Sequence, residues 1–105
     1  MIPAPPPYPA DFGFTDDHAL LRSTARRVLG ERCPMAEVRR LGDDPVGFDP
    51  ALHRELAELG WTGLLVPDSL GGSQLGYLAA ALVIEESGRA LLPGPLWSTL
   101  LATVA

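Results

Sequence analysis

Proline and glycine divide this chain into short stretches in which apolar side chains repeat at helical spacing. Pro34, Pro50 and Pro95 stand where one stretch ends or the next begins. Proline cannot continue a helix, because it has no backbone N–H and its ring clashes with the preceding turn, but it suits the first turn. Between these residues, apolar side chains recur every three or four positions, which indicates amphipathic helices. The pattern predicts an all-α fold, a small antiparallel helical bundle without sustained strands.

Five helices are expected, and their ends are marked by capping residues. Thr15 is a good N-cap, because its hydroxyl can accept a backbone N–H of the first turn. Gly60 is a good end signal, because a left-handed C-cap favours a residue without Cβ. The expected helices span about 15–32, 35–41, 50–59 and 74–89, and the last one starts at Pro95. That last helix has no stop signal before Ala105, so the bundle is predicted to be incomplete at its C-terminal end.

The connection between the third and fourth helices, ELGWTGLLVPDSLGGSQLG, is rich in glycine. Its apolar part, WTGLLVPD, is predicted to be a brief extended segment that is too short for a sheet of its own. A glycine-rich turn before a helix can hold a phosphate, but the spacing of Gly71, Gly72 and Gly76 fits neither a Walker nor a dinucleotide-binding motif. A tight turn is favoured, with a positive φ at one glycine and close packing at another.

The composition limits the classes of partner. The 105 residues carry a net charge of -5, and every basic residue is arginine, so nucleic acid is not expected as a ligand. A hydrophobic fraction of 47% predicts apolar surface that needs a partner. The single Cys33 excludes an intrachain disulfide, and no metal-site pattern is present. The N-terminus lacks the features of a signal peptide and no stretch reaches the roughly 20 apolar residues of a membrane span, so a cytoplasmic location is expected.

No catalytic residue can be assigned from the residues themselves. Glu85 and Glu86 are adjacent on a helix and point about 100° apart, so they do not converge on one atom. One exposed acid and one acid paired with an arginine, such as Arg89, is favoured over an acid–base pair. Cys33 is expected to be a small buried group, and neither histidine has a nucleophile at a readable spacing. Solvent exposure is expected for Arg22, Arg26 and Arg27, and a packing role for Trp61 and Trp97.

The order of these pieces resembles the N-terminal helical domain of the acyl-CoA dehydrogenase family. In that family a helix ending in Leu-Gly-Trp precedes a GLLVP-like run and Gly-Gly, and a helix closing with Glu-Glu and Gly-Arg-Ala follows. This chain has ELAELGWTGLLVPDSLGGSQLGYLAAALVIEESGRALLPGPLWSTLLA. The resemblance covers about residues 15–105, which are expected to form the domain. Residues 1–14 are a Pro-rich lead-in that is expected to be flexible.

The resemblance implies α,β-dehydrogenation of an acyl-CoA thioester, in which a carboxylate removes the α-proton and FAD accepts a hydride. The family's catalytic Glu and most of its flavin site lie in later domains, so catalysis is not assigned to Glu85 or Glu86. FAD is expected for the full-length family member and not for this chain alone. This segment is expected to pack on the flavin domain and to wall the acyl cavity. The helix after PGP borders the acyl chain in relatives, so the candidate cavity residues share one face of it: Leu96, Thr99, Leu100 and Thr103. The same stripe would also suit an ordinary core.

The expected partners are the remaining domains of the same enzyme or a partner subunit, with acyl-CoA in the full assembly and a homo- or hetero-oligomeric state. Two alternatives stay open at this point. One is a stand-alone helical interaction module, or remnant, without catalytic activity. The other is a small helical DNA-binding regulator, which the acidic charge disfavours.

Overall fold

The structure is a computed structural model that describes residues 13–104. In chain order its elements are α1 (Asp16–Arg32), α2 (Met35–Gly42), α3 (Pro50–Glu58), the 3₁₀ turns η1 (Trp61–Gly63) and η2 (Asp68–Leu70), α4 (Gly76–Arg89) and α5 (Leu96–Ala102). No strand occurs within residues 13–104, which agrees with the predicted all-α fold. Residues 1–12, which make up most of the predicted flexible lead-in, and Ala105 lie outside the described residues.

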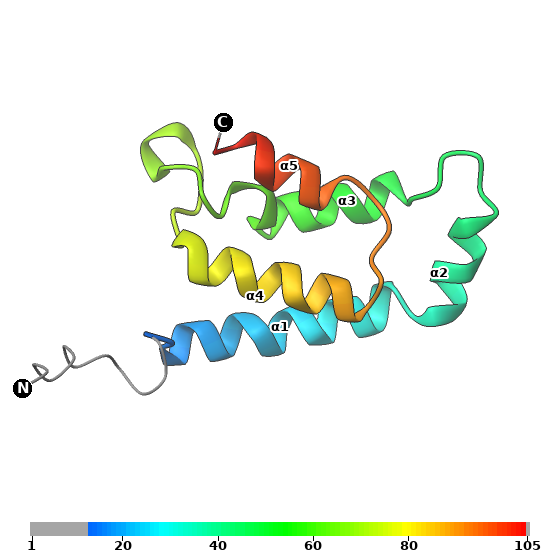
Figure 1. Cartoon of the computed structure of the whole chain (residues 1–105), viewed down its shortest axis with the longest axis horizontal. Helices are drawn as coiled ribbons and strands as arrows, with labels where there is room; N and C mark the ends of the chain where they lie inside the picture. The colour runs from blue at the N-terminus through cyan, green and yellow to red at the C-terminus, as the bar shows by residue number, and fades with distance from the viewer. Residues whose placement is uncertain (1–12, 105) are drawn as a thin grey trace, which may run out of the picture.

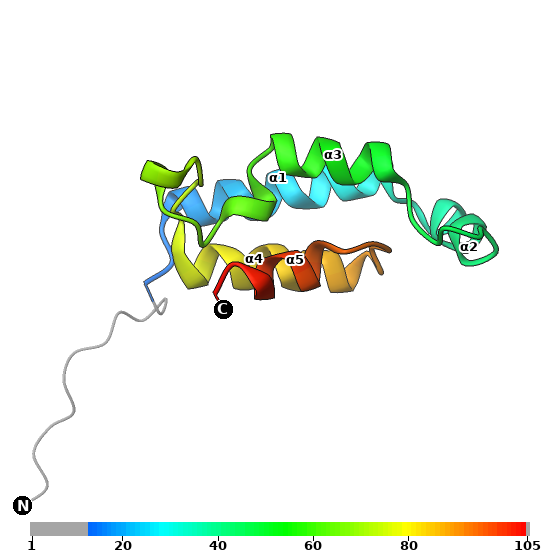
Figure 2. The same cartoon turned by 90° about the horizontal axis from the view of Figure 1, so that it is seen from above.

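Four of the helices form a bundle, and α2 lies beyond one end of it (Figure 1). α1 and α4 run side by side in the same direction, whereas α3 and α5 run back in the opposite direction. Seen from above, α1 and α3 form one layer and α4 and α5 form the other (Figure 2). The long connection between α3 and α4 lies at the end of the bundle where α1 and α4 begin.

The helix ends follow from the capping residues. The Thr15 hydroxyl accepts a hydrogen bond from His18 N at 3.4 Å, while Thr15 N donates to His18 Nδ1 at 3.0 Å. The Asp49 carboxylate accepts from Ala51 N at 3.0 Å and so caps α3. Gly60 ends α3 with φ of 89°, in the left-handed region that costs a residue with Cβ about 1–2 kcal/mol. The caps at Thr15 and Gly60 are therefore confirmed. The sequence could predict them because each cap depends on one residue and its nearest neighbours.

The connection from Gly60 to Gly76 contains two 3₁₀ turns and not the brief extended segment that its apolar residues predicted. Trp61 accounts for the difference. Its side chain is buried, and η1 contacts both α3 and α5, so the backbone turns in order to place the indole in the core. The predicted tight turn is confirmed: Gly71 has φ of 84°, and a Cβ at Gly72 would lie 2.1 Å from Val66 O.

The core sits between the two layers, with Trp61 among its largest fully buried side chains. Its members come from α1, α3, η1, α4 and α5 and from the residues directly after α1 and η1: Ala25, Val28, Leu29, Cys33, Leu52, Leu56, Trp61, Leu64, Ala79, Ala80, Val83, Leu96 and Leu100. Not every leucine of these helices joins the core, since Leu20 of α1 and Leu59 after α3 are 66% and 48% exposed.

The last helix is shorter than the sequence predicted. α5 ends at Ala102, although residues 96–105 contain neither glycine nor proline. The hydroxyl of Thr103 donates to Leu100 O at 2.7 Å, and Thr103 N is shared among carbonyls of the preceding turn. A threonine side chain that bonds to the local backbone in this way competes with regular helix hydrogen bonding. Residues 103 and 104 accordingly form a turn.

Candidate functional site

The four predicted cavity residues of α5 divide into two kinds. Leu96 and Leu100 are 4% and 2% exposed and belong to the core of this domain. Thr99 and Thr103 are half-buried. The spacing of the four therefore serves first to attach α5 to the bundle. Whether they also line an acyl cavity stays a prediction.

The opposite side of α5 carries a second apolar stripe that the domain leaves uncovered. Trp97 and Leu101 are 56% and 50% exposed, and their spacing of four residues places them on one side of the helix. Val104, which is 49% exposed, follows them in the turn after the helix. The prediction that Trp97 is a packing residue is therefore wrong for the domain itself. Trp61 is the buried indole, whereas Trp97 lies at the surface.

An apolar hollow lies beside this stripe, where the chain passes from α4 to α5. Its volume is about 260 Å³, and Trp97 forms part of its wall. The wall also contains two glycines, and one of them, Gly94, has φ of 127°, so that the chain can turn closely past Phe48. The complete lining is Ile84, Ser87, Gly88, Leu91, Leu92, Gly94, Leu96 and Trp97. The stripe and the hollow share Trp97, and together we call them the α5 surface.

A charge pair between a half-exposed arginine and a buried carboxylate joins α1 to α4. Glu86 is 2% exposed, and Arg26 binds it with both arms of the guanidinium, Nε to Oε2 at 3.1 Å and Nη2 to Oε1 at 3.0 Å. This bidentate contact holds the pKa of Glu86 below its usual range, against the opposing effect of burial. A buried carboxylate without a partner would be costly, so the pair fixes the position of α1 on α4. Glu86 is therefore a structural acid.

The prediction of one exposed and one paired acid is confirmed, but the identity of the partner was wrong. Glu86 pairs with Arg26 on α1, 60 residues away in sequence, and not with Arg89 on its own helix. Arg26 therefore does not simply face solvent. Glu85 is the exposed acid, with its Oε2 3.7 Å from Arg22 Nη2. Spacing along a helix could not reveal a partner on another helix, since the signal for that contact is tertiary.

The glycine-rich turn has no free donors for a phosphate. Each backbone N–H from Leu70 to Gly76 already donates to a carbonyl oxygen within the same connection. The turn thus fixes the approach of the chain to α4 and does not cradle an anion.

Burial raises the pKa of the Cys33 thiol, which agrees with its interpretation as a small buried group. Among residues 13–104, no group of three metal-binding side chains lies together. Within the same range, no helix has both the length and the apolar character needed to cross a membrane.

Comparison with known proteins identifies the class. Residues 15–104 match the family described as acyl-CoA dehydrogenase, N-terminal domain. The chain therefore belongs to the acyl-CoA dehydrogenase family, whose members are oxidoreductases that use FAD.

Individual relatives support this assignment. The chain is 36% identical over 93 residues to acyl-CoA dehydrogenase IpdE2 of Mycolicibacterium smegmatis, which covers 88% of this chain and 30% of that protein. It is 39% identical over 80 residues to benzylmalonyl-CoA dehydrogenase of Aromatoleum aromaticum, covering 75% of this chain and 20% of that protein. Among solved structures, the Tcur3481-Tcur3483 steroid ACAD superposes with a TM-score of 0.75 at 33% identity, over 83% of this chain and 24% of that one. The chain thus spans less than a third of the length of each of these relatives.

Proposed function

We propose that this chain is the N-terminal part of an FAD-dependent enzyme that introduces an α,β double bond into an acyl-CoA thioester. The match of residues 15–104 to the family supports this assignment. The N–H groups of the glycine turn are already bonded and Arg26 is bound to Glu86, so neither feature offers donors to the phosphates of FAD. No step of the reaction is therefore assigned to them. Remaining domains or a partner subunit supply the cofactor site, in a cytoplasmic homo- or hetero-oligomer.

In this proposal the segment packs on the flavin domain and forms one wall of the acyl cavity through the α5 surface. The observation that carries the proposal is the exposed stripe of Trp97, Leu101 and Val104 beside an apolar hollow. A contiguous apolar patch of this kind marks a site that another domain or an apolar ligand covers. Leu96 and Leu100 would hold the wall on the bundle from behind, and Thr99 and Thr103 would form its edges.

The test is the variant Leu101→Asp in the enzyme assembled from this chain and the remaining domains or partner subunit. A carboxylate on the α5 surface would be buried without a partner, so we expect kcat/KM for acyl-CoA oxidation to fall by about tenfold or more. Retention of FAD during gel filtration should fall with it if the stripe also meets the flavin domain. Leu20→Asp is the matched control, because it makes the same change at an exposed leucine, 66% against 50% for Leu101, that lies on α1. Equal activity of the two variants would show that the α5 surface is not covered in the enzyme.

A stand-alone interaction module remains the alternative, because the same exposed stripe would serve a partner protein. The visible spectrum of material purified with its natural partners distinguishes the two. Flavin absorbance in the complex that holds this chain supports the enzyme. A colourless, stable complex supports the module.

A further inference from the structure

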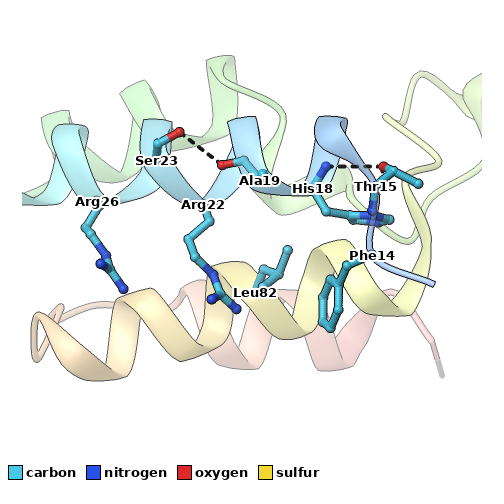
Figure 3. Close-up of a pocket in the computed structure, with 8 residues that line it drawn as sticks. All are labelled: Phe14, Thr15, His18, Ala19, Arg22, Ser23, Arg26 and Leu82. Carbon is cyan, nitrogen blue, oxygen red and sulfur yellow. Dashed lines mark hydrogen bonds between the residues drawn. The ribbon is translucent and has the colours of Figure 1, made fainter. Parts of the chain in front are cut away.

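A second hollow lies between α1 and α4, at the end where both helices begin. Its volume is about 410 Å³, within the range of about 300–1,000 Å³ that is typical of sites for small ligands. Phe14, Ala19 and Leu82 contribute apolar surface. Figure 3 shows the side chains of Arg22 and Arg26 extending from α1 toward α4, on the same side as Phe14 and Leu82. The hollow therefore combines an apolar wall with two guanidinium groups.

The two arginines differ in the hydrogen bonds that their guanidinium groups donate. Arg26 donates two hydrogen bonds to Glu86 and is held in place by them. Arg22 has carboxylate oxygens only at 3.7 Å on Glu85 and 3.9 Å on Glu86, and its guanidinium donates no hydrogen bond to another described residue. Its side chain is 41% exposed. Arg22 thus keeps its planar set of N–H donors for a further acceptor, at the rim of an apolar hollow.

We propose that this hollow binds a small carboxylate with a short apolar tail, and that Arg22 is its anion-binding residue. A guanidinium matches the two oxygens of a carboxylate in a bidentate arrangement, which a point charge does not. The tail would lie against Phe14 and over the buried Leu82, so that the apolar surface of the tail and of Phe14 is removed from water. The site differs from the α5 surface in both its residues and its ligand, so it does not depend on the proposed dehydrogenase function.

Glu85 competes with the ligand for Arg22. Its carboxylate is exposed and lies near the guanidinium without hydrogen bonding to it, so it weakens the attraction for an incoming anion. Removing this charge should strengthen binding of the acid and leave binding of a neutral analogue unchanged. An exposed pair of this kind contributes little, so the expected gain is about two- to fivefold.

The experiment is an NMR titration of the full chain with 4-phenylbutyrate and, separately, with the neutral 4-phenylbutyramide. We expect the acid to shift the backbone amide signals of Phe14, Ala19 and Leu82 and to bind about tenfold more tightly than 4-phenylbutyramide, because only the acid pairs its charge with Arg22 and accepts through two oxygens. Equal binding of acid and amide, or shifts confined to other parts of the chain, would overturn the proposal.

Three variants test the role of Arg22. Arg22→Gln should reduce the affinity for the acid to that for the amide. Arg27→Gln is the matched control on the same helix, because Arg27 lies outside the hollow, 4.0 Å from Glu31. Glu85→Gln should tighten binding of the acid, so the proposal stays testable even where Arg22→Gln lowers stability. An unchanged affinity in both Arg22→Gln and Glu85→Gln would rule out Arg22 as the anion-binding residue.

Discussion

The close approach at Gly72 can be tested with a single methyl group. A Cβ at this position would lie 2.1 Å from Val66 O and 2.4 Å from Val66 Cβ. The carbonyl cannot swing away freely, because Val66 O accepts a hydrogen bond from Gln74 N at 3.1 Å. Relief therefore requires the two sides of the connection to separate. Overpacking of this kind costs typically about 1–3 kcal/mol, and the contact with backbone places Gly72→Ala at about 3 kcal/mol.

Two further glycines separate this steric cost from the other effects of adding a methyl group. Gly71 has φ of 84° but open space around its Cβ position, so Gly71→Ala should cost only the backbone strain of about 1–2 kcal/mol. Gly30 lies in α1, also with open space, so Gly30→Ala should stabilise the chain by up to about 1 kcal/mol through helix propensity. The free energy of unfolding should therefore be highest for Gly30→Ala, lower for the unchanged chain, lower again for Gly71→Ala and lowest for Gly72→Ala.

Urea unfolding followed by circular dichroism measures these differences, with thermal melting as a second observable. In a domain of this size each kcal/mol corresponds to a shift of about 4–8 °C in Tm, so Gly72→Ala should lower Tm by about 12–24 °C. An unfolded Gly72→Ala chain would agree with the upper end of that cost. If Gly72→Ala proves no more destabilising than Gly71→Ala, then the chain does not pass Val66 as closely as the structure places it, and the reasoning is refuted.

The remaining predictions concern the buried pair and the two indoles. Arg26 lowers the pKa of Glu86 in the folded state. The ionised Glu86 therefore adds to the free energy of unfolding above the unfolded pKa of about 4.3, and this stabilisation is lost as pH falls through the folded pKa. Stability measured by urea unfolding between pH 6 and about pH 3 should thus decline less steeply in Glu86→Gln, and a parallel decline in both proteins would contradict this. Trp61→Ala should cost about 3–5 kcal/mol, as expected for a buried aromatic side chain, whereas Trp97→Ala should change the stability of this chain by less than about 1 kcal/mol. Similar melting temperatures for the two tryptophan variants would show that the assignment of the buried indole is wrong.

The sequence predicted the five helices, and it predicted their ends except for that of α5, because most helix ends depend on neighbouring residues. Thr15 and Gly60 act within a turn of the chain, and both caps lie where they were expected. The tight turn at Gly71 and Gly72 was predicted for the same reason. The brief extended segment after Gly60 was predicted wrongly, since burial of Trp61 against α3 and α5 decided the local backbone.

The sequence by itself determined an all-α chain, its turns and its family, because periodicity, caps and motif order are local properties. Only the tertiary structure decided which arginine pairs with Glu86, because Arg26 is 60 residues away and is one of four arginines in α1. The tertiary structure alone also decided which side of α5 faces outward. Leu96 with Leu100 and Trp97 with Leu101 have the same spacing and similar apolar character, so no pattern in the sequence distinguishes the two sides. The position of α5 against η1 buries the first pair and leaves the second exposed.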